Sequence, residues 1–391
     1  MYFSRFFILI SVLVALFSAR FYKTIKHKVE ILGLRRVVES YNIDKCQKIQ
    51  GPIHCEDAAI HRPSGLVFLS CESDRYKTYP YCDNESEKSF GEIWVTSLDK
   101  DPSVPVKLSI PSISTPAFRP VGISVSDDEA DPSKLTLAVI NRYLPNNGTV
   151  EIFHYRIPED SSTLSADGLV HHRTIRSPHI FSPNGLVVVD QRRGKDGTPS
   201  FFLTNDSYLS HVLLKVAEVL LGIPLTTVAF YDAQKDVVHT VISGLAFPNG
   251  IATDVSGQHV YVASTVTGDI SEYSINWSHE SPILKKTKSV YTGYALDNLD
   301  YEPKQGRVVA AAHPNAMEVM GMMGKCSELA TMNRHPSSLV LSLDTPRNEW
   351  ATVLSDPGAN YSTSSTALID ADRKRMIVVG LLDKGYLDCH I

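Results

Sequence analysis

The chain has 391 residues, of which 43% are hydrophobic and 21% are charged, and these proportions are typical of a globular protein. They exclude a disordered chain, a collagen-like repeat and a polytopic membrane protein. The formal net charge is -5, and residues 1–36 contain seven basic residues but only one acid, so the remaining body is more acidic than the whole. Because an acidic body repels phosphate backbones, we expect no nucleic-acid partner.

Residues 6–19 form an apolar run behind Arg5, with the length of a signal-peptide core rather than of a membrane-spanning helix. Phe17 occupies a position where a cleavage site needs a small residue, so a removed signal and a retained anchor both stay open. The basic flank at residues 20–28 would lie on anionic headgroups beside an anchor. We therefore expect a signal or anchor segment over residues 1–45, with residues 6–19 as a candidate membrane or lipid contact.

Cysteines and glycosylation sequons point to the secretory pathway. The chain has six cysteines and five Asn-X-Ser/Thr sequons, which suit an oxidising lumen or the cell exterior. We expect a protein that is secreted or anchored on the lumenal face of a membrane. Cys46 and Cys389 lie near the two ends of the body, so a bridge between them would tie the termini, although six cysteines allow many pairings. With Asn205 set aside for another use, the expected glycosylation sites are Asn84, Asn147, Asn276 and Asn360.

Short β-rich runs alternate with Gly, Pro, Asn and Asp along the body, which is typical of a sandwich, barrel or propeller. A turn pattern of Pro, any residue, Gly and then Leu or Ile recurs, followed by two degenerate relatives. Its copies occupy residues 63–66, 120–123, 183–186, 248–251, 296–299 and 365–368. They lie 48 to 69 residues apart, which suits one blade with its loops, and each precedes a β run as an innermost strand would. The repeat predicts an all-β fold, a six-bladed β-propeller that occupies residues 46–391 as one domain.

One amphipathic helical pattern, at residues 207–221, interrupts the strands. Its polar face carries His211, Lys215 and Glu218. The apolar face consists of Leu209, Val212, Leu213, Val216, Val219 and Leu220. Two interpretations stay open: a helix packed on a blade, or a lid or membrane-facing element beside a site.

Side-chain oxygens recur in the repeated turns, which should converge on the central channel of a propeller. Asn184, Asn249, Asp297 and Asn298 lie in these turns, and the pair Glu56 and Asp57 lies just before the first copy. Carboxylates mixed with amides suit a hard cation, and calcium takes six to eight oxygen ligands. Zinc would need His or Cys, and magnesium prefers water-rich octahedra. Turn chemistry alone explains a single Asn, but it does not require Asn at the same place in successive blades.

Motifs along the whole body resemble those of the serum paraoxonase and arylesterase family. They occupy residues 55–57, 63–68, 118–124, 203–208, 247–251, 296–299, 313–315 and 386–389. The resemblance implies a six-bladed, calcium-dependent hydrolase. It also favours a retained hydrophobic N-terminal segment.

Carried over by position, the resemblance implies two calcium sites and one disulfide. The catalytic calcium would be held by Glu56, Asn184, Asn249, Asp297 and Asn298. The second, structural calcium would use Asp57, the main-chain carbonyl of Ile123 and an aspartate where this chain has Gly185, so this site has lost a carboxylate. The family's terminal disulfide corresponds to Cys46 and Cys389.

The chain departs from the family at the general base. Where the family has a histidine pair, this sequence has Val121 and Arg142, and neither side chain accepts a proton at neutral pH. Calcium would then act as a Lewis acid on the carbonyl, with Asp297 or Glu56 assisting the water. His313 is another candidate base, and Arg142 is a candidate for orienting a polar substrate.

The first hypothesis is a calcium-dependent hydrolase of small carboxylic esters, including aryl esters, or lactones. The second is a non-catalytic, calcium-stabilised lumenal propeller that binds a hydrophobic ligand or a protein partner after loss of the base. A third is a related propeller that performs condensation or another reaction without calcium. Retention of all five ligand positions of the catalytic site argues against the third.

Overall fold

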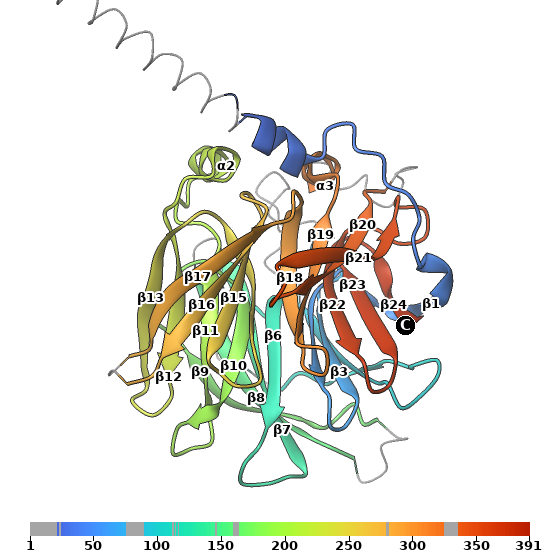
Figure 1. Cartoon of the computed structure of the whole chain (residues 1–391). Coiled ribbons are helices and arrows are strands. Elements are labelled where there is room, and N and C mark those ends of the chain that lie inside the picture. Colours follow the sequence, from blue (N-terminus) through green and yellow to red (C-terminus); the bar gives the residue numbers. More distant parts are fainter. Residues whose placement is uncertain are drawn as a thin grey trace, which may run out of the picture.

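The computed structural model describes residues 22 and 25–391, except 76–89, 112, 114, 116, 145–146, 159–163, 279–280 and 324–334. Within these residues the body forms six four-stranded antiparallel sheets, arranged as blades around a central axis (Figure 1). This architecture confirms the six-bladed β-propeller that the turn repeat predicted.

Each blade contributes four consecutive strands except the last, which takes its outermost strand from the start of the chain. The first three complete blades are β2 (Cys55–His61), β3 (Leu66–Cys71), β4 (Glu92–Ser97), β5 (Val106–Lys107); β6 (Pro120–Asp127), β7 (Lys134–Leu144), β8 (Asn147–Arg156), β9 (Leu169–Ile175); and β10 (Pro183–Arg193), β11 (Pro199–Asn205), β12 (Thr226–Asp232), β13 (Val237–Leu245). The next two are β14 (Pro248–Thr253), β15 (His259–Ser264), β16 (Asp269–Asn276), β17 (Ile283–Tyr291); and β18 (Ala295–Glu302), β19 (Arg307–His313), β20 (Ser338–Asp344), β21 (Glu349–Asp356). The closing blade is β22 (Ser364–Asp370), β23 (Arg375–Gly380), β24 (Lys384–His390) and β1 (Cys46–Ile53), and the 3-10 helix η1 (Ile43–Lys45) precedes β1.

The ring closes where β1, from the start of the body, pairs with β24 at the end of the chain. Cys46 lies directly opposite Cys389 in this pairing, and the two form the expected disulfide. A second disulfide, which the sequence did not single out, joins Cys55 to Cys71 between β2 and β3. The Cys46–Cys389 disulfide therefore joins the first and last strands covalently at the point where they could otherwise separate.

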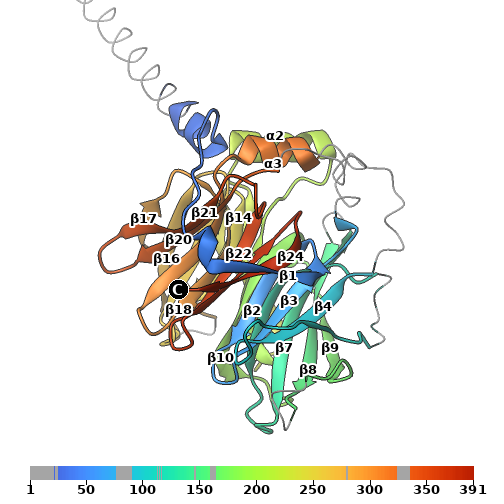
Figure 2. The same ribbon diagram turned by 90° about the vertical axis from the view of Figure 1, so that its right-hand side faces the viewer.

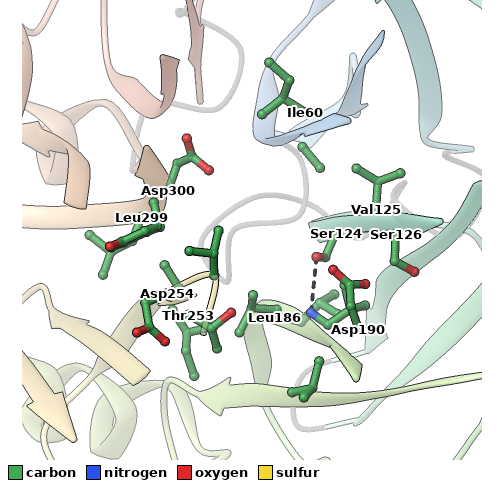
Figure 3. Close-up of a pocket in the computed structure, with 18 of the residues that line it drawn as sticks. Ile60, Ser124, Val125, Ser126, Leu186, Asp190, Thr253, Asp254, Leu299 and Asp300 are labelled. Atoms are coloured by element: carbon green, nitrogen blue, oxygen red, sulfur yellow. Dashed lines mark hydrogen bonds between the residues drawn. The ribbon is translucent and has the colours of Figure 1, made fainter. Parts of the chain in front are cut away.

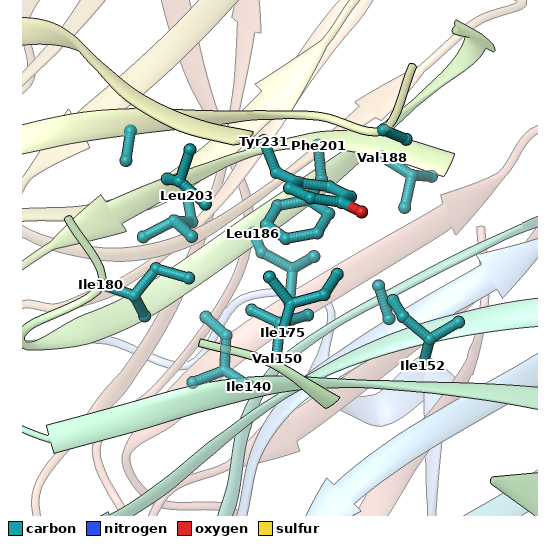
Figure 4. Packing of buried hydrophobic residues seen from close by; sticks show 14 of the residues in the cluster. Ile140, Val150, Ile152, Ile175, Ile180, Leu186, Val188, Phe201, Leu203 and Tyr231 are labelled. Carbon is teal, nitrogen blue, oxygen red and sulfur yellow. The ribbon is translucent and has the colours of Figure 1, made fainter. Parts of the chain in front are cut away.

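Buried clusters of aliphatic and aromatic side chains fill the space between blades. In the cluster between the β6–β9 and β10–β13 sheets, Ile140 and Val150 meet Leu186, Phe201 and Tyr231 (Figure 4). Strands near the axis are covered on both faces: every residue of β3 and of β11 is buried. This burial explains why those strands read as continuous rather than alternating apolar runs.

The structure corrects the first copy of the turn repeat. Residues 63–66 form the hairpin between β2 and β3, where Gly65 has a φ of 67°, so β3 is the second strand of its blade. The innermost strand is β2, which carries Glu56 and Asp57. The other five copies lie within the first residues of an innermost strand, and each such pairing has a register irregularity there. The Pro-Ser-Gly sequence at 63–65 is hairpin chemistry, which resembles the repeat by composition alone.

The basic flank before the propeller packs against it. Residues 25–32 are helical, and Ile31 is buried. The Arg36 guanidinium lies 4.3 Å from the ring centre of Tyr294 and donates to the carbonyls of Pro314 and Gly293 at 3.0 Å each. The apolar run at residues 6–19 lies outside the described residues. No described helix is long and apolar enough to cross a membrane.

The helices α2 (Val212–Leu221) and α3 (Ala316–Met323) lie at one end of the propeller, together with the N-terminal helical residues (Figure 2). α2 begins five residues later than the expected start at 207. The reason is that the Glu218 carboxylate accepts the N–H groups of Tyr208 and Leu209, at 2.9 and 2.8 Å, and so draws them into a loop. Gly222, with a φ of 64°, ends the helix in the left-handed conformation.

The leucines of α2 face outward, whereas the polar residue Glu218 is buried. Leu213 is 70% exposed and Leu221 is 69% exposed. Glu218 is buried, and Lys215 is sufficiently buried that desolvation lowers its pKa. Val212, Val216 and Val219 of the expected apolar face are half-buried, so the leucines face outward while the valines are partly covered, and both interpretations of this helix stay open.

We predict that the closing disulfide stabilises the ring more than the second disulfide does. Replacing Cys46 and Cys389 with serine should cost about 2–5 kcal/mol of unfolding free energy, because the bridge closes a loop of 343 residues. The matched control is the Cys55→Ser/Cys71→Ser double variant, whose loop spans 16 residues. A larger loss of unfolding free energy in the Cys55→Ser/Cys71→Ser variant, measured by urea unfolding of both variants, would contradict the prediction.

Candidate functional site

The innermost strands begin at the end of the propeller that carries α2 and α3, and their first residues approach one another closely. A Cβ atom added to Gly122 would lie 2.5 Å from the carbonyl oxygen of Asn184 in the next blade. One added to Gly185 would lie 2.8 Å from the carbonyl oxygen of Asn249, and Gly250 is equally close to the blade after it. The recurring glycine of the turn repeat thus permits contact between neighbouring backbones at the axis.

Hydroxyl groups on the second strands join these backbones. Thr204 Oγ1, on β11, donates to the Asn249 carbonyl of the next blade at 2.6 Å. Thr265 Oγ1, just after β15, donates to the Leu296 carbonyl of the blade that follows at 2.7 Å. These bonds fix the relative positions of successive turns, and so of the side chains that the turns carry.

Three side-chain oxygens at this point are buried and have no hydrogen-bond partner among the residues that the structure describes. They are Glu56 Oε2, Asn184 Oδ1 and Asn249 Oδ1, on side chains whose residues are 5–7% exposed. A buried acceptor without a partner costs about 1–3 kcal/mol, and native proteins contain few of them. Three such acceptors from three blades favour a bound cation or a group that donates hydrogen bonds to them.

The amide groups are oriented so that their oxygens are left bare. Asn184 Nδ2 donates to Asp206 Oδ2 at 3.2 Å, and Asn249 Nδ2 donates to Thr265 Oγ1 at 3.2 Å. Asn298 Nδ2 donates to a main-chain carbonyl of β2 at 2.9 Å. Each amide nitrogen donates a hydrogen bond within the protein, and the oxygens of Asn184 and Asn249 have no partner among the described residues.

The charges at the axis favour a cation. Burial raises the pKa of Glu56 well above its ordinary value, and the neighbouring charges of Asp57 and Asp297 raise it further. The described residues contain no cluster of three or more His, Cys, Asp or Glu side chains suited to a metal ion. The oxygens here come instead from two carboxylates and from amides, a mixture that suits a hard cation such as calcium.

His313 lies beside this set. At the end of β19, its Nε2 is 2.9 Å from Asp297 Oδ2, and both residues are buried. His313 Nδ1 has no partner among the described residues. An imidazole that is oriented by a carboxylate and has one free nitrogen is equipped to accept a proton.

The residues at the positions of the family's histidine pair have other contacts. Val121 belongs to the apolar cluster of Figure 4. The Arg142 guanidinium donates to both carboxylate oxygens of Asp206, at 2.6 and 3.0 Å, and to Ser182 Oγ at 2.9 Å. Burial opposes ionisation of Asp206, but Arg142 and Lys215 outweigh it and hold the pKa of Asp206 below its usual range. Arg142 is thus engaged in an ion pair.

Asp206 is a residue that the sequence reasoning missed. It connects the Arg142 ion pair to the amide of Asn184, and its motif at residues 203–208 was recognised without any role for the carboxylate. Asp206 directly follows β11 in the sequence, and nothing there indicates that Arg142 from another blade pairs with it.

The side chains of the second implied calcium site are already occupied. Asp57 Oδ2 accepts the Ile123 N–H at 2.9 Å, and Asp57 Oδ1 accepts the Ala58 N–H and the Thr366 hydroxyl at 2.8 Å each. Burial raises the pKa of Asp57 to about 7, although these hydrogen bonds favour the carboxylate. Gly185 contributes no side chain, so this group differs from the set around Glu56.

A cavity of about 370 Å³ opens along the axis at the other end of the innermost strands (Figure 3). Its lining includes Asp190, Asp254 and Asp300 near the strand ends, and it reaches inward to Asp57 and Asn298. The cavity does not reach the bare oxygens of Glu56, Asn184 and Asn249 through its lining residues.

The predicted glycosylation sites fall into two groups. Asn276 and Asn360 are exposed at the surface. Asn84 lies outside the described residues, as does the side chain of Asn147. Asn205 is fully buried and its amide donates to the His179 carbonyl and to Thr227, which agrees with setting that sequon aside.

We predict that the Arg142–Asp206 pair is required for stability. The Arg142→Met variant leaves a buried carboxylate without its bidentate partner and should lose about 2–4 kcal/mol of unfolding free energy in urea. Arg173→Met is the matched control, since that arginine forms two exposed ion pairs worth less than about 1 kcal/mol. Equal losses for both variants would contradict a structural role for Arg142.

Comparison with known proteins agrees with this geometry. The family profile described as Arylesterase matches residues 37–391. The chain is 28% identical to serum paraoxonase/arylesterase 1 of Homo sapiens over 74% of each chain. It is 29% identical to serum paraoxonase/arylesterase 2 of Rattus norvegicus over 92% of each chain.

A third relative is serum paraoxonase/lactonase 3 of Homo sapiens, which is 28% identical over 74% of this chain and 75% of that one. Among solved structures, a gluconolactonase from Xanthomonas campestris has the same fold, with a TM-score of 0.51 and 12% identity over 88% of each chain. Since the family profile spans nearly the whole described body, the chain belongs to the arylesterase family, which includes the serum paraoxonases.

Proposed function

We propose that this protein is a calcium-dependent hydrolase of small carboxylic esters, including aryl esters, and of lactones. The observation that supports this most is the set of bare oxygens on Glu56, Asn184 and Asn249, next to the His313–Asp297 pair. The relatives named as arylesterases and lactonases support ester or lactone hydrolysis as the general activity.

The residues that would hold the calcium are those that the sequence predicted for the catalytic site. They are Glu56, Asn184, Asn249, Asp297 and Asn298. When bound, calcium would polarise the substrate carbonyl as a Lewis acid and stabilise the negative charge that develops on its oxygen. The hydrogen bonds that the three amide nitrogens donate within the protein orient the amides whose oxygens would hold the ion.

His313 is the residue that the geometry favours as the base. Its free Nδ1 would take a proton from the attacking water, while Asp297 orients the ring through Nε2 and stabilises the imidazolium that forms. Asp297 therefore acts through His313 as well as on the ion. Glu56, whose Oε2 has no partner among the described residues, is the alternative proton acceptor.

Arg142 is assigned a structural part in this mechanism. Its guanidinium is paired with Asp206, which in turn orients the amide of Asn184. Orientation of a polar substrate by Arg142 would require that pair to open.

The second candidate function is a non-catalytic propeller stabilised by calcium. Val121, packed in the core, and Arg142, paired with Asp206, are the observations that favour it, because neither replaces the family's histidines as a base. This candidate predicts calcium-dependent stability with no turnover of any ester or lactone.

Hydrolysis of a panel of aryl esters and lactones, measured with and without chelator, tests the proposal. We expect turnover that chelation abolishes and added calcium restores. His313→Gln should lower kcat by about 100-fold or more while the calcium-dependent rise in melting temperature is kept. Turnover that is insensitive to chelator, or no turnover in calcium-loaded protein, would overturn the proposed activity.

The proposed location is the secretory pathway or the cell exterior. Two disulfides among the described cysteines suit an oxidising compartment, and the relatives are named as serum proteins. Exposed apolar side chains gather at the end that carries the helices; we call them the apolar cap: Tyr22, Ile25, Val29, Leu213, Leu214, Leu220, Leu221, Met317 and Met320. We propose that this cap contacts a lipid surface.

Vesicle flotation with the full chain tests the lipid contact. Replacing Leu213 and Leu221 with serine should reduce the bound fraction, because both side chains would leave the lipid interface. The control replaces Val255 and Ile283, which are exposed apolar residues outside the cap, with serine. If both double variants float equally well, the cap is not the contact.

A further inference from the structure

Asp57 is enclosed by donors that belong to the protein. The Ile123 N–H approaches one carboxylate oxygen from β6, and the Ala58 N–H and the Thr366 hydroxyl approach the other, all within 2.9 Å. An ionised carboxylate has about four lone-pair sites, so three of them are in use here. A cation beside Asp57 would find a single lone-pair site left on this carboxylate, because the three donors, two of them main-chain groups held in strands, use the others.

Thr366 comes from β22, the innermost strand of the closing blade, and connects it to β2. Its hydroxyl lies 2.8 Å from Asp57 Oδ1 and 3.2 Å from the Glu56 carbonyl. Ser365, the residue before it, donates to the Cys55 carbonyl at 2.9 Å. The main chain on both sides of the Glu56 side chain is therefore held from the closing blade.

The third side chain of a second cation site is missing, although Asp57, Ile123 and Gly185 all line the inner end of the cavity. Gly185 stands where the resemblance implies an aspartate, and a Cβ there would meet the Asn249 carbonyl at 2.8 Å. The hydroxyl of Thr204 accepts the Gly185 N–H at 3.0 Å and donates to the same Asn249 carbonyl at 2.6 Å. A hydrogen-bonded bridge thus occupies the place next to Gly185.

The carboxylate of Asp57 differs from the neighbouring candidate ligands in having partners on both oxygens. Glu56, Asn184 and Asn249 each keep a buried oxygen without a partner, whereas both oxygens of Asp57 have partners. Two carboxylates that follow each other on one strand therefore differ: Glu56 keeps an oxygen without a partner among the described residues, and Asp57 connects β2 to β6 and β22.

We propose that Asp57, Thr366 and the Ile123 N–H form a hydrogen-bonded lock in place of a second cation site, with Thr366 as a positioning residue for Glu56. The positioning part rests on the proposed function, in which Glu56 is a ligand of the single calcium. The lock itself does not depend on catalysis.

Metal analysis of the purified full chain, after calcium loading and desalting, tests closure of the second site. We expect one calcium per chain. Two calcium ions per chain would overturn the proposed lock. Finding no calcium would contradict the calcium dependence of the proposed function. The second position would still be closed, as the lock requires, so failure of the lock and failure of the proposed function are distinguishable.

Variants at Thr366 test its positioning role. Thr366→Val keeps the shape but removes the hydroxyl, and should weaken binding of terbium, used as a luminescent calcium probe, by about 10-fold or more. Thr366→Ser restores the hydroxyl and should recover the affinity. The control is Thr136→Val, a fully buried threonine of β7 whose hydroxyl contacts His154.

The result that would overturn the positioning role is unchanged terbium affinity in Thr366→Val. Equal weakening in Thr136→Val, or failure of Thr366→Ser to recover, would also overturn it, since either would indicate general destabilisation. Melting in chelator separates the lock from the ion: Thr366→Val should melt lower than the parent protein without calcium, whereas Thr366→Ser should not.

Discussion

Where the innermost strands begin, neighbouring backbones lie too close for a side chain at Gly122, Gly185 or Gly250. This close approach is the constraint on which the site depends, because it brings turns from different blades to one point on the axis. Side chains that branch from those turns then share a small buried volume. Their amide nitrogens donate to the surrounding protein, and the oxygens of Glu56, Asn184 and Asn249 are left without a partner among the described residues.

Such an arrangement is unfavourable without a ligand. Burial and two neighbouring carboxylates raise the pKa of Glu56, and the bare amide oxygens add negative dipoles. A divalent cation would relieve both, and under the proposed function it would make this axis a centre for carbonyl chemistry. Asp57, one residue away, avoids the same cost by accepting hydrogen bonds from three groups of the protein.

The sequence predicted the features that local patterns determine. It did not predict the contacts between residues on different blades. Turn spacing predicted six blades, and the Asn residues in three of the turns predicted the amide ligands of the candidate site. The roles of Asp206 and Thr366 depend on partners in other blades, so no local signal could reveal them. The orientation of α2 was also hidden, because burial of Glu218 against two loop N–H groups outweighs the burial of its leucines.

The most direct test is a crystal structure of the full chain with calcium, using anomalous scattering to locate the ion. We predict one peak on the axis, with Glu56 Oε2, Asn184 Oδ1 and Asn249 Oδ1 at about 2.3–2.6 Å from it. We also predict that Asp57 keeps its hydrogen bonds to Thr366 and Ile123. An empty axis in calcium-saturated crystals, or a peak bonded to Asp57, would contradict the account.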